Sequence, residues 1–122
     1  MMNAYLQVAF GGAIGSMARL GLYRALPVRD FPAATMLVNV AGSLAMGLLA
    51  ALLAQRGGLA WAPFLMPGVL GGFTTFSAFS LDALTLWERG QGGLTVAYVA
   101  GSVVLSLGAV VLGLALGRGL SA

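Results

Sequence analysis

Three apolar stretches of the sequence carry polar or aromatic side chains at helical spacing, among neighbours that are almost all aliphatic. In one stretch, a single helix face would hold Thr35, Asn39, Gly42, Ser43 and Met46. A later stretch would align Thr95, Tyr98, Ser102 and Ser106. Between them, Phe76, Phe79 and Ser80 share a face. Polar groups are costly inside apolar helices, so this alignment indicates either hydrogen bonds between helices or a pathway for a polar substance.

The chemistry of these stripes favours an anion over a cation. They offer uncharged donors, namely hydroxyls and the Asn39 amide with its two N–H hydrogens, and they contain no carboxylate. An aromatic ring has a negative face and a positive edge, so Phe76 and Phe79 could present ring edges to an anion. Such groups suit a small, hard anion that must lose its water, but they do not identify it. For any one hydroxyl, helix-to-helix hydrogen bonding is the better explanation.

The third apolar stretch is interrupted near its middle by Pro67-Gly68, Gly71-Gly72 and Thr74-Thr75. Irregular backbone at membrane depth persists only where it is buried in protein or lines a polar cavity, and broken helices often build ion sites. We therefore predict a functional break, although a simple kink is the alternative. Carbonyl groups freed there could hold a hard cation between Gly71 and Thr74.

Composition indicates that a membrane surrounds these stretches. Of the 122 residues, 60% are hydrophobic and only 7% are charged, whereas soluble domains carry about 25% charged residues. A bilayer crossing needs roughly 20 apolar residues. We predict an all-α membrane protein, a single domain spanning 1–122 with four transmembrane helices at about 4–23, 33–54, 61–87 and 94–116, the first retained rather than cleaved as a signal peptide.

The residues that are missing exclude several classes of protein. There is no cysteine, histidine or lysine, so thiol chemistry, disulfides and histidine catalysis have no candidate residue. No nucleophile–base pair or set of metal-ligating side chains is present, and we do not expect an enzyme. The six arginines are scattered through the chain, whereas nucleic-acid binding would require a basic cluster.

The arginines also give a weak orientation signal. With four crossings, Arg56 and Arg118 would lie on one side, and Arg24, Arg29 and Arg89 on the other. Because orientation depends on an excess of basic residues on one side, the chain could insert both ways and form an antiparallel dimer. Two small-residue pairs predict close helix packing: Gly11 with Gly15, and Gly113 with Gly117.

Four segments together resemble the Fluc (CrcB) family of fluoride channels. The run 71–80, GGFTTFSAFS, resembles the family's GG-x-TTFSTFS signature, which is highly specific. Residues 38–43, VNVAGS, resemble its N-x-x-G-S segment, and residues 11–19, GGAIGSMAR, resemble its opening GG-x-x-G-x-x-x-R. Tyr98 and Ser102 match a Y-x-x-x-S in the last helix. The likeness covers all four helices in order and spacing.

The resemblance implies a dual-topology, antiparallel homodimer in the inner (plasma) membrane, with two pores that let cytoplasmic fluoride leave passively and so relieve its toxicity. Phe76 and Phe79 would form aromatic fluoride sites and Asn39 would donate to the ion. The polar neighbours of the pathway would be Ser77, Ser80, Tyr98 and Ser102. Carbonyls of Gly71 and Thr74 from both subunits would hold a structural sodium ion. Arg19 would attract anions in a vestibule, or snorkel from a helix end.

Departures from the family pattern are small, and two rival classes fit less well. Ala78 replaces a common threonine, Ala34 a glycine and Asp82 a glutamate; Ala78 removes one possible hydroxyl. A small multidrug exporter or a proton-coupled antiporter needs a membrane-embedded acid, and Asp82 lies only about a turn from a helix end. A non-transporting scaffold subunit would explain the glycines but neither Asn39 nor the phenylalanine pair.

Overall fold

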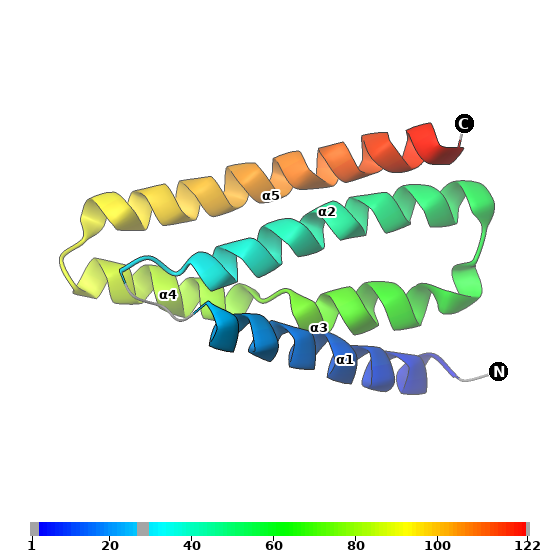
Figure 1. The fold of residues 1–122 in the computed structure, drawn as a ribbon, viewed down its shortest axis with the longest axis horizontal. Helices are drawn as coiled ribbons and strands as arrows, with labels where there is room; N and C mark the ends of the chain where they lie inside the picture. Colours follow the sequence, from blue (N-terminus) through cyan, green and yellow to red (C-terminus); the bar gives the residue numbers. More distant parts are fainter. Residues whose placement is uncertain (1–2, 27–29, 122) are drawn as a thin grey trace.

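The computed structural model describes residues 3–26 and 30–121, and this part of the chain is helical without any strand (Figure 1). The elements in chain order are α1 (Ala4–Ala25), α2 (Ala33–Arg56), the short 3-10 turn η1 (Leu59–Trp61), the π-helical segment η2 (Phe64–Leu70), α3 (Gly71–Phe73), α4 (Phe76–Glu88) and α5 (Gly92–Ser121). Arg29, one of the arginines used in the prediction of orientation, lies outside the described residues.

Helix α1 begins at a side-chain cap and ends close to a basic residue. The Asn3 side chain accepts a hydrogen bond from the Leu6 amide at 2.9 Å, which satisfies one of the free N–H groups of the first turn. Arg24 stands in the last turn, where a positive charge is favoured by the helix dipole. The helix therefore spans the first predicted stretch and continues two residues beyond its predicted end.

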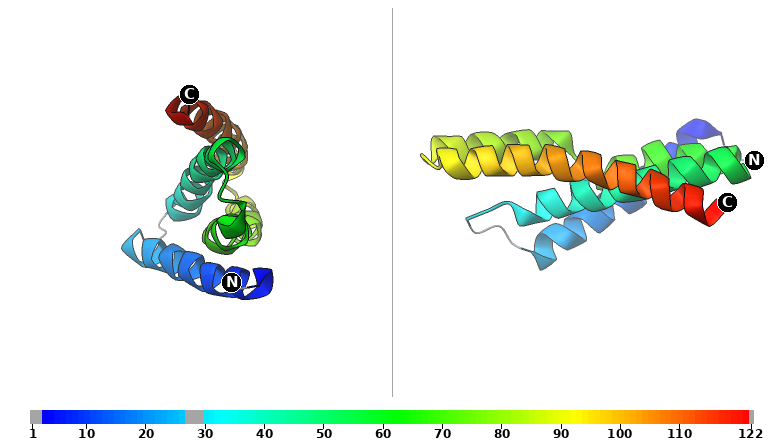
Figure 2. Two further views of the ribbon diagram at one scale, coloured as in Figure 1. Left: turned by 90° about the vertical axis from the view of Figure 1, so that its right-hand side faces the viewer. Right: turned by 90° about the horizontal axis from the view of Figure 1, so that it is seen from above.

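The helices form two packed pairs, joined side by side. Helix α5 runs along α2, and α1 runs along η2 and α3, as two views of the ribbon agree (Figures 1 and 2). Both pairs approach through glycine. A Cβ atom on Gly113 would collide with the Leu44 carbonyl on α2, and one on Gly11 with the Phe64 carbonyl. The predicted close packing of the small-residue pairs is confirmed, and it occurs within a single subunit.

The third apolar stretch consists of two helical arms with an extended segment between them. The first arm runs through η2 and α3 to Phe73, and its π-helical turns contain Pro67. Thr74 (ψ 159°) and Thr75 (ψ 121°) then adopt extended backbone, and α4 begins at Phe76. The predicted break is confirmed at these two threonines.

Three helical segments of the described chain are long and apolar enough to cross a membrane: Ala33–Arg56, Leu59–Glu88 and Gly92–Leu120. Helix α1 has 22 residues, about 33 Å at 1.5 Å per residue, but Gln7 and Arg19 lower its hydropathy. The start of α1 and the end of α5 lie at the same end of the bundle as the connection between α2 and η1 (Figure 1). That arrangement is compatible with a crossing by α1, and the fourth crossing stays a prediction.

Candidate functional site

A groove of about 330 Å³ opens where the break faces α2 and α5. Helix α2, the extended segment, α4 and α5 all contribute to it. Its lining comprises Asn39, Gly42, Ser43, Met46, Thr74, Thr75, Phe76, Phe79, Ser102, Val103, Ser106 and Val110. Half of these side chains are hydroxyls or amides and none is charged. The predicted polar stripes of the second and fourth stretches thus meet at the break, joined by its two phenylalanines.

Asn39 holds the extended segment through both ends of its amide. Its Oδ1 accepts a hydrogen bond from the Thr75 N–H at 2.8 Å, and its Nδ2 donates to the Thr75 carbonyl at 3.0 Å. The amide therefore replaces the helical hydrogen bond that the Thr75 N–H loses at the break and adds a second bond to its carbonyl. Because Nδ2 has two hydrogens, one N–H remains for another acceptor in the groove.

Thr74 and Thr75 complete the two helix ends at the break. The Thr74 hydroxyl donates back to the Leu70 carbonyl at 3.0 Å, which closes the first arm. The Thr75 hydroxyl accepts from the Ala78 amide at 3.1 Å and so caps α4. Thr74 also packs directly on Gly42 of α2, where a Cβ atom would collide with its methyl group. The sequence analysis named Thr74 for its carbonyl and Thr75 only as part of the interruption and the signature, although Thr75 is an ordinary capping residue three positions before Ala78.

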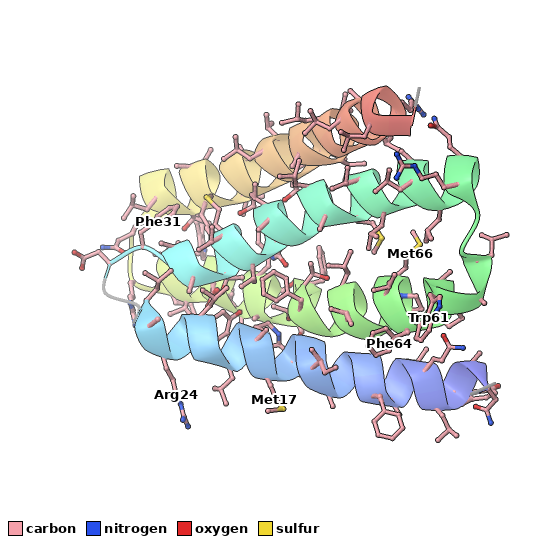
Figure 3. All side chains as sticks on the ribbon, turned by 45° about the vertical axis from the view of Figure 1, so that its right-hand side comes forward. Met17, Arg24, Phe31, Trp61, Phe64 and Met66 are labelled. Carbon is pink, nitrogen blue, oxygen red and sulfur yellow. The ribbon has the colours of Figure 1, made fainter. Side chains whose placement is uncertain are left out.

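The aromatic side chains form a continuous row that begins in the groove. The rings of Phe76 and Phe79 lie 5.5 Å apart, and Phe79 lies 5.3 Å from Tyr98. The rings of Tyr98 and Phe31 meet edge to face, with their centres 5.5 Å apart and an angle of 88° between their planes. Phe31 lies at the end of the bundle where α2 begins (Figure 3). Phe76 is 78% exposed in the single chain, whereas Tyr98 is fully buried. The row therefore runs from an exposed ring in the groove, through the buried Tyr98 of α5, to the half-buried Phe31.

Ser102 places a hydroxyl in the groove wall without a hydrogen-bond partner. The residue is only 5% exposed, and its Oγ has no partner among the described residues. Tyr98, one turn earlier, does not line the groove and donates its hydroxyl hydrogen to Asp82 at 3.1 Å. The sequence did not indicate this partner for Tyr98, because Asp82 belongs to a different helix. Asp82 was noted only as a replacement for the glutamate that is usual in the family.

Ser77 and Ser80 lie on α4 but outside the groove lining of the single chain. The Ser77 hydroxyl shares a hydrogen bond with that of Thr75 at 3.2 Å. The Ser80 hydroxyl donates to the Phe76 carbonyl at 2.9 Å, within its own helix. Both residues are exposed. Their place beside a pathway stays a prediction.

The carbonyl groups at the break differ in their hydrogen bonding. The Gly72 carbonyl accepts from Arg19 and that of Thr75 accepts from Asn39. The Gly71 carbonyl lacks its usual helical partner, because the Thr75 N–H is taken by Asn39. The carbonyl of Thr74 likewise receives no backbone bond from Ala78, whose N–H goes to the Thr75 hydroxyl. Within the described residues no cluster of three His, Cys, Asp or Glu side chains could hold a metal, so a cation here would depend on such carbonyls.

Arg19 lies against the break on the side opposite the groove. Its Nε donates to the Gly72 carbonyl at 3.1 Å, and its guanidinium carbon stands 6.0 Å from the centre of the Tyr23 ring. The side chain is half-buried. The vestibule and snorkelling alternatives drawn from the sequence did not include this contact, which joins residues 53 positions apart.

Comparisons with known proteins place the chain in a family. Residues 6–114 match the family described as CrcB-like protein, Camphor Resistance (CrcB). The chain belongs to this family. A protein of Paracoccus denitrificans named fluoride-specific ion channel FluC is 61% identical, with both chains covered over their full length. Proteins of the same name from Cereibacter sphaeroides and Agrobacterium fabrum are 56% and 50% identical, with 98% of this chain and 98% and 99% of theirs covered. The family is one of ion channels and not of enzymes.

Proposed function

We propose that this protein is a fluoride-selective channel that conducts fluoride passively out of the cytoplasm and so relieves fluoride toxicity. One observation carries the proposal: uncharged donors and two phenylalanines line a groove at a helix break, in a chain similar over its full length to fluoride-specific channels. Fluoride is small and strongly hydrated. Its pathway must replace water with hydrogen-bond donors while binding weakly enough to release the ion.

Two features of the groove favour an anion. The N-terminus of α4 lies at the groove, and the positive end of a 13-residue helix dipole attracts negative charge. The available donors are the second N–H of Asn39 and the unpartnered Ser102 hydroxyl. Because no arginine lines the groove, an anion would meet partial charges only and would not be trapped by a full positive charge.

The absence of acids from the groove lining disfavours coupling to protons. A proton-coupled exporter or antiporter needs a titratable group at the transport site. The nearest carboxylate to the aromatic row, that of Asp82, accepts a hydrogen bond from Tyr98 and lies outside the groove. Passive conduction therefore explains the lining better than exchange does.

The exposed ring of Phe76 supports the antiparallel homodimer that we infer. In a single chain this large apolar side chain is 78% exposed beside polar groups, and a second copy would cover it and close the groove into a pore. With α1 as the first of four crossings, two chains inserted in opposite orientations would form a dual-topology pair, related by a two-fold axis in the membrane plane. We place this assembly in the inner (plasma) membrane, surrounded by the lipid bilayer.

The break also fits the structural sodium ion that the family resemblance implied. The carbonyls of Gly71 and Thr74 have lost their helical hydrogen bonds, and hard cations prefer oxygen ligands. Two carbonyls from each subunit would give a four-oxygen set at the centre of the dimer. When bound, such an ion would be coordinated by the free carbonyl oxygens and would add positive potential near the pathway.

Growth of a fluoride-sensitive bacterium tests the cellular role. In a strain without its own fluoride exit route, this protein should restore growth at fluoride concentrations that stop the parent strain. Phe79→Ile should not restore it at equal protein level, whereas Phe10→Ile, on the exposed side of α1, should. If the wild-type chain reaches the membrane and growth is not restored, export of fluoride from cells is not its function.

A further inference from the structure

We propose that Arg19 is a positioning residue. It fixes the backbone next to the extended segment, Thr74 and Thr75, from the side opposite the groove, and it does not contact the permeating ion. Three contacts carry this inference: the Arg19 hydrogen bond to the Gly72 carbonyl, the position of its guanidinium over the Tyr23 ring, and the hydrogen bond between the Tyr23 and Thr35 hydroxyls. The effect on conduction rests on the proposed function. The effect on the backbone does not.

The Gly72 carbonyl needs this partner because the helix stops one residue later. The last carbonyls of a helix have no amide to accept from, and an unpaired one in an apolar setting is costly. The same helix end carries the negative pole of the dipole, so a cationic donor is doubly favourable there. Arg19 supplies such a donor at 3.1 Å, in a half-buried setting where the contact is little screened by water.

Glycine contacts bring Arg19 within reach of the break. A Cβ atom on Gly72 would lie 2.6 Å from the Gly12 carbonyl oxygen, and one on Gly15 would lie 2.8 Å from the Phe73 nitrogen. Helix α1 therefore touches the end of the first arm backbone to backbone. Arg19 follows Gly15 by one helical turn, so the same face of α1 carries the close contact and the hydrogen bond.

Tyr23 links this contact to the segment that Asn39 holds. The Tyr23 and Thr35 hydroxyls share a hydrogen bond at 3.0 Å, and Thr35 is only 3% exposed. Thr35 and Asn39 are four residues apart and stand on one face of α2. From that face, Asn39 binds the N–H and carbonyl of Thr75. Arg19 thus binds the backbone at Gly72, just before the extended segment, and Asn39 binds it at Thr75, within the segment. The two side chains come from helices that are tied together.

A positioning role and an anion-attracting role predict different dependences of the rate. A charge that concentrates fluoride near an entrance acts mainly at low fluoride, and it weakens as the Debye length falls from ~10 Å at 0.1 M to ~3 Å at 1 M salt. A residue that fixes the backbone beside Phe76 determines the shape of the pathway itself. Its loss lowers the rate at saturating fluoride and does so equally at both salt concentrations.

The test compares three variants of the full-length protein in liposomes and in detergent. Arg19→Gln removes the charge and the guanidinium donors, and leaves only a shorter, neutral amide in their place. Tyr23→Phe removes only the hydroxyl bonded to Thr35 and leaves the net charge unchanged. Arg24→Gln removes one charge from the same helix at an exposed position whose side chain points away from the bundle (Figure 3). Fluoride efflux is measured over a range of fluoride concentrations at both salt levels, and amide hydrogen exchange is followed at Thr74 and Thr75.

Arg19→Gln is expected to lower the saturating rate about tenfold, as loss of a charged hydrogen bond would, and to speed exchange at Thr74 and Thr75. Tyr23→Phe should change both in the same direction by less, and Arg24→Gln should change neither. If the loss in Arg19→Gln vanishes at saturating fluoride or in high salt, with exchange unchanged, the proposal is wrong.

Two further outcomes remain decisive. If Arg19→Gln does not assemble, Tyr23→Phe decides, and normal rate and exchange in that variant overturn the proposal. If the parent protein conducts no fluoride, the proposed function fails, while faster exchange in Arg19→Gln would still support the positioning role.

Discussion

The unwound segment has two sides, and they differ in how completely they are covered. Toward α1, glycine backbones touch and the Gly72 carbonyl is paired with Arg19. Toward α2 and α5, a groove opens in which Phe76 is mostly exposed and the Ser102 hydroxyl has no partner. The comparison indicates that the side toward α1 fixes the backbone, and that the side toward α2 and α5 leaves hydrogen-bond donors and ring edges available to an ion. Substitutions on the side toward α1 should therefore act through the position of the backbone, and those on the groove side mainly on conduction itself.

The largest effect is expected on the packed side, from Gly15→Ala. The added methyl would collide with the Val69 carbonyl and lie 2.8 Å from the Phe73 nitrogen, and neither backbone group can move aside. We expect a loss of about 3 kcal/mol or more in stability, with little assembled protein on size exclusion. Gly12→Ala is the matched control, since its methyl would have no neighbour within 4 Å. Equal yields of the two variants would show that α1 is not tightly packed against the break at Gly15.

On the groove side, Phe76→Ile and Phe79→Ile should each slow fluoride efflux at least about tenfold while the protein stays assembled. The substitution keeps apolar volume but removes the ring edges that would face the ion. Efflux from liposomes, normalised to reconstituted protein, measures the effect. Phe10→Ile serves as control, because Phe10 is exposed on α1. Parental rates in both variants would remove the aromatic residues from the pathway.

Asn39 lies on the groove side but combines both roles, since it fixes the Thr75 backbone and also lines the groove. Asn39→Ala should cost about 2 kcal/mol, for two hydrogen bonds of about 1 kcal/mol each, and should slow efflux as well. Ser43→Ala, on the next part of the same groove wall, should stay within about 0.5 kcal/mol of the parent. Thermal unfolding in detergent provides the measurement, and an unchanged midpoint for Asn39→Ala would contradict the role of its amide.

The smallest structural effect is expected from Ser102→Ala. Because the buried hydroxyl has no partner, its removal should leave stability within about 0.5 kcal/mol of the parent or raise it slightly. Fluoride efflux should fall roughly fivefold, which corresponds to about 1 kcal/mol in the barrier. Ser16→Ala on the exposed side of α1 should change neither quantity. A destabilised Ser102→Ala with normal efflux would reverse the assignment of the two sides.

Local features of the molecule could be predicted from the sequence. The helices follow from long apolar stretches, and the break follows from the Gly71-Gly72 and Thr74-Thr75 pairs, which disfavour a continuous helix. Asn39 and Ser102 could be proposed for one site because each stands out on an aliphatic helix. These conclusions need only spacing along one helix.

Contacts between helices could not be predicted in the same way. The hydrogen bond from Arg19 to Gly72 and the pairing of Tyr98 with Asp82 depend on which helices are neighbours and at what register. A helical wheel likewise placed Ser80 beside Phe76 and Phe79, but its hydroxyl bonds within α4 and lies outside the groove. The periodicity of one helix does not say which side meets another.

Efflux from sealed liposomes tests the central claim most directly. Purified protein is reconstituted in vesicles loaded with fluoride or with chloride, and the loss of each anion is followed with an ion-selective electrode while a potassium ionophore balances the charge. We predict rapid loss of fluoride, no loss of chloride above that of empty vesicles, and the same fluoride rate with or without a proton gradient. Vesicles that retain fluoride as tightly as protein-free lipid would contradict the account.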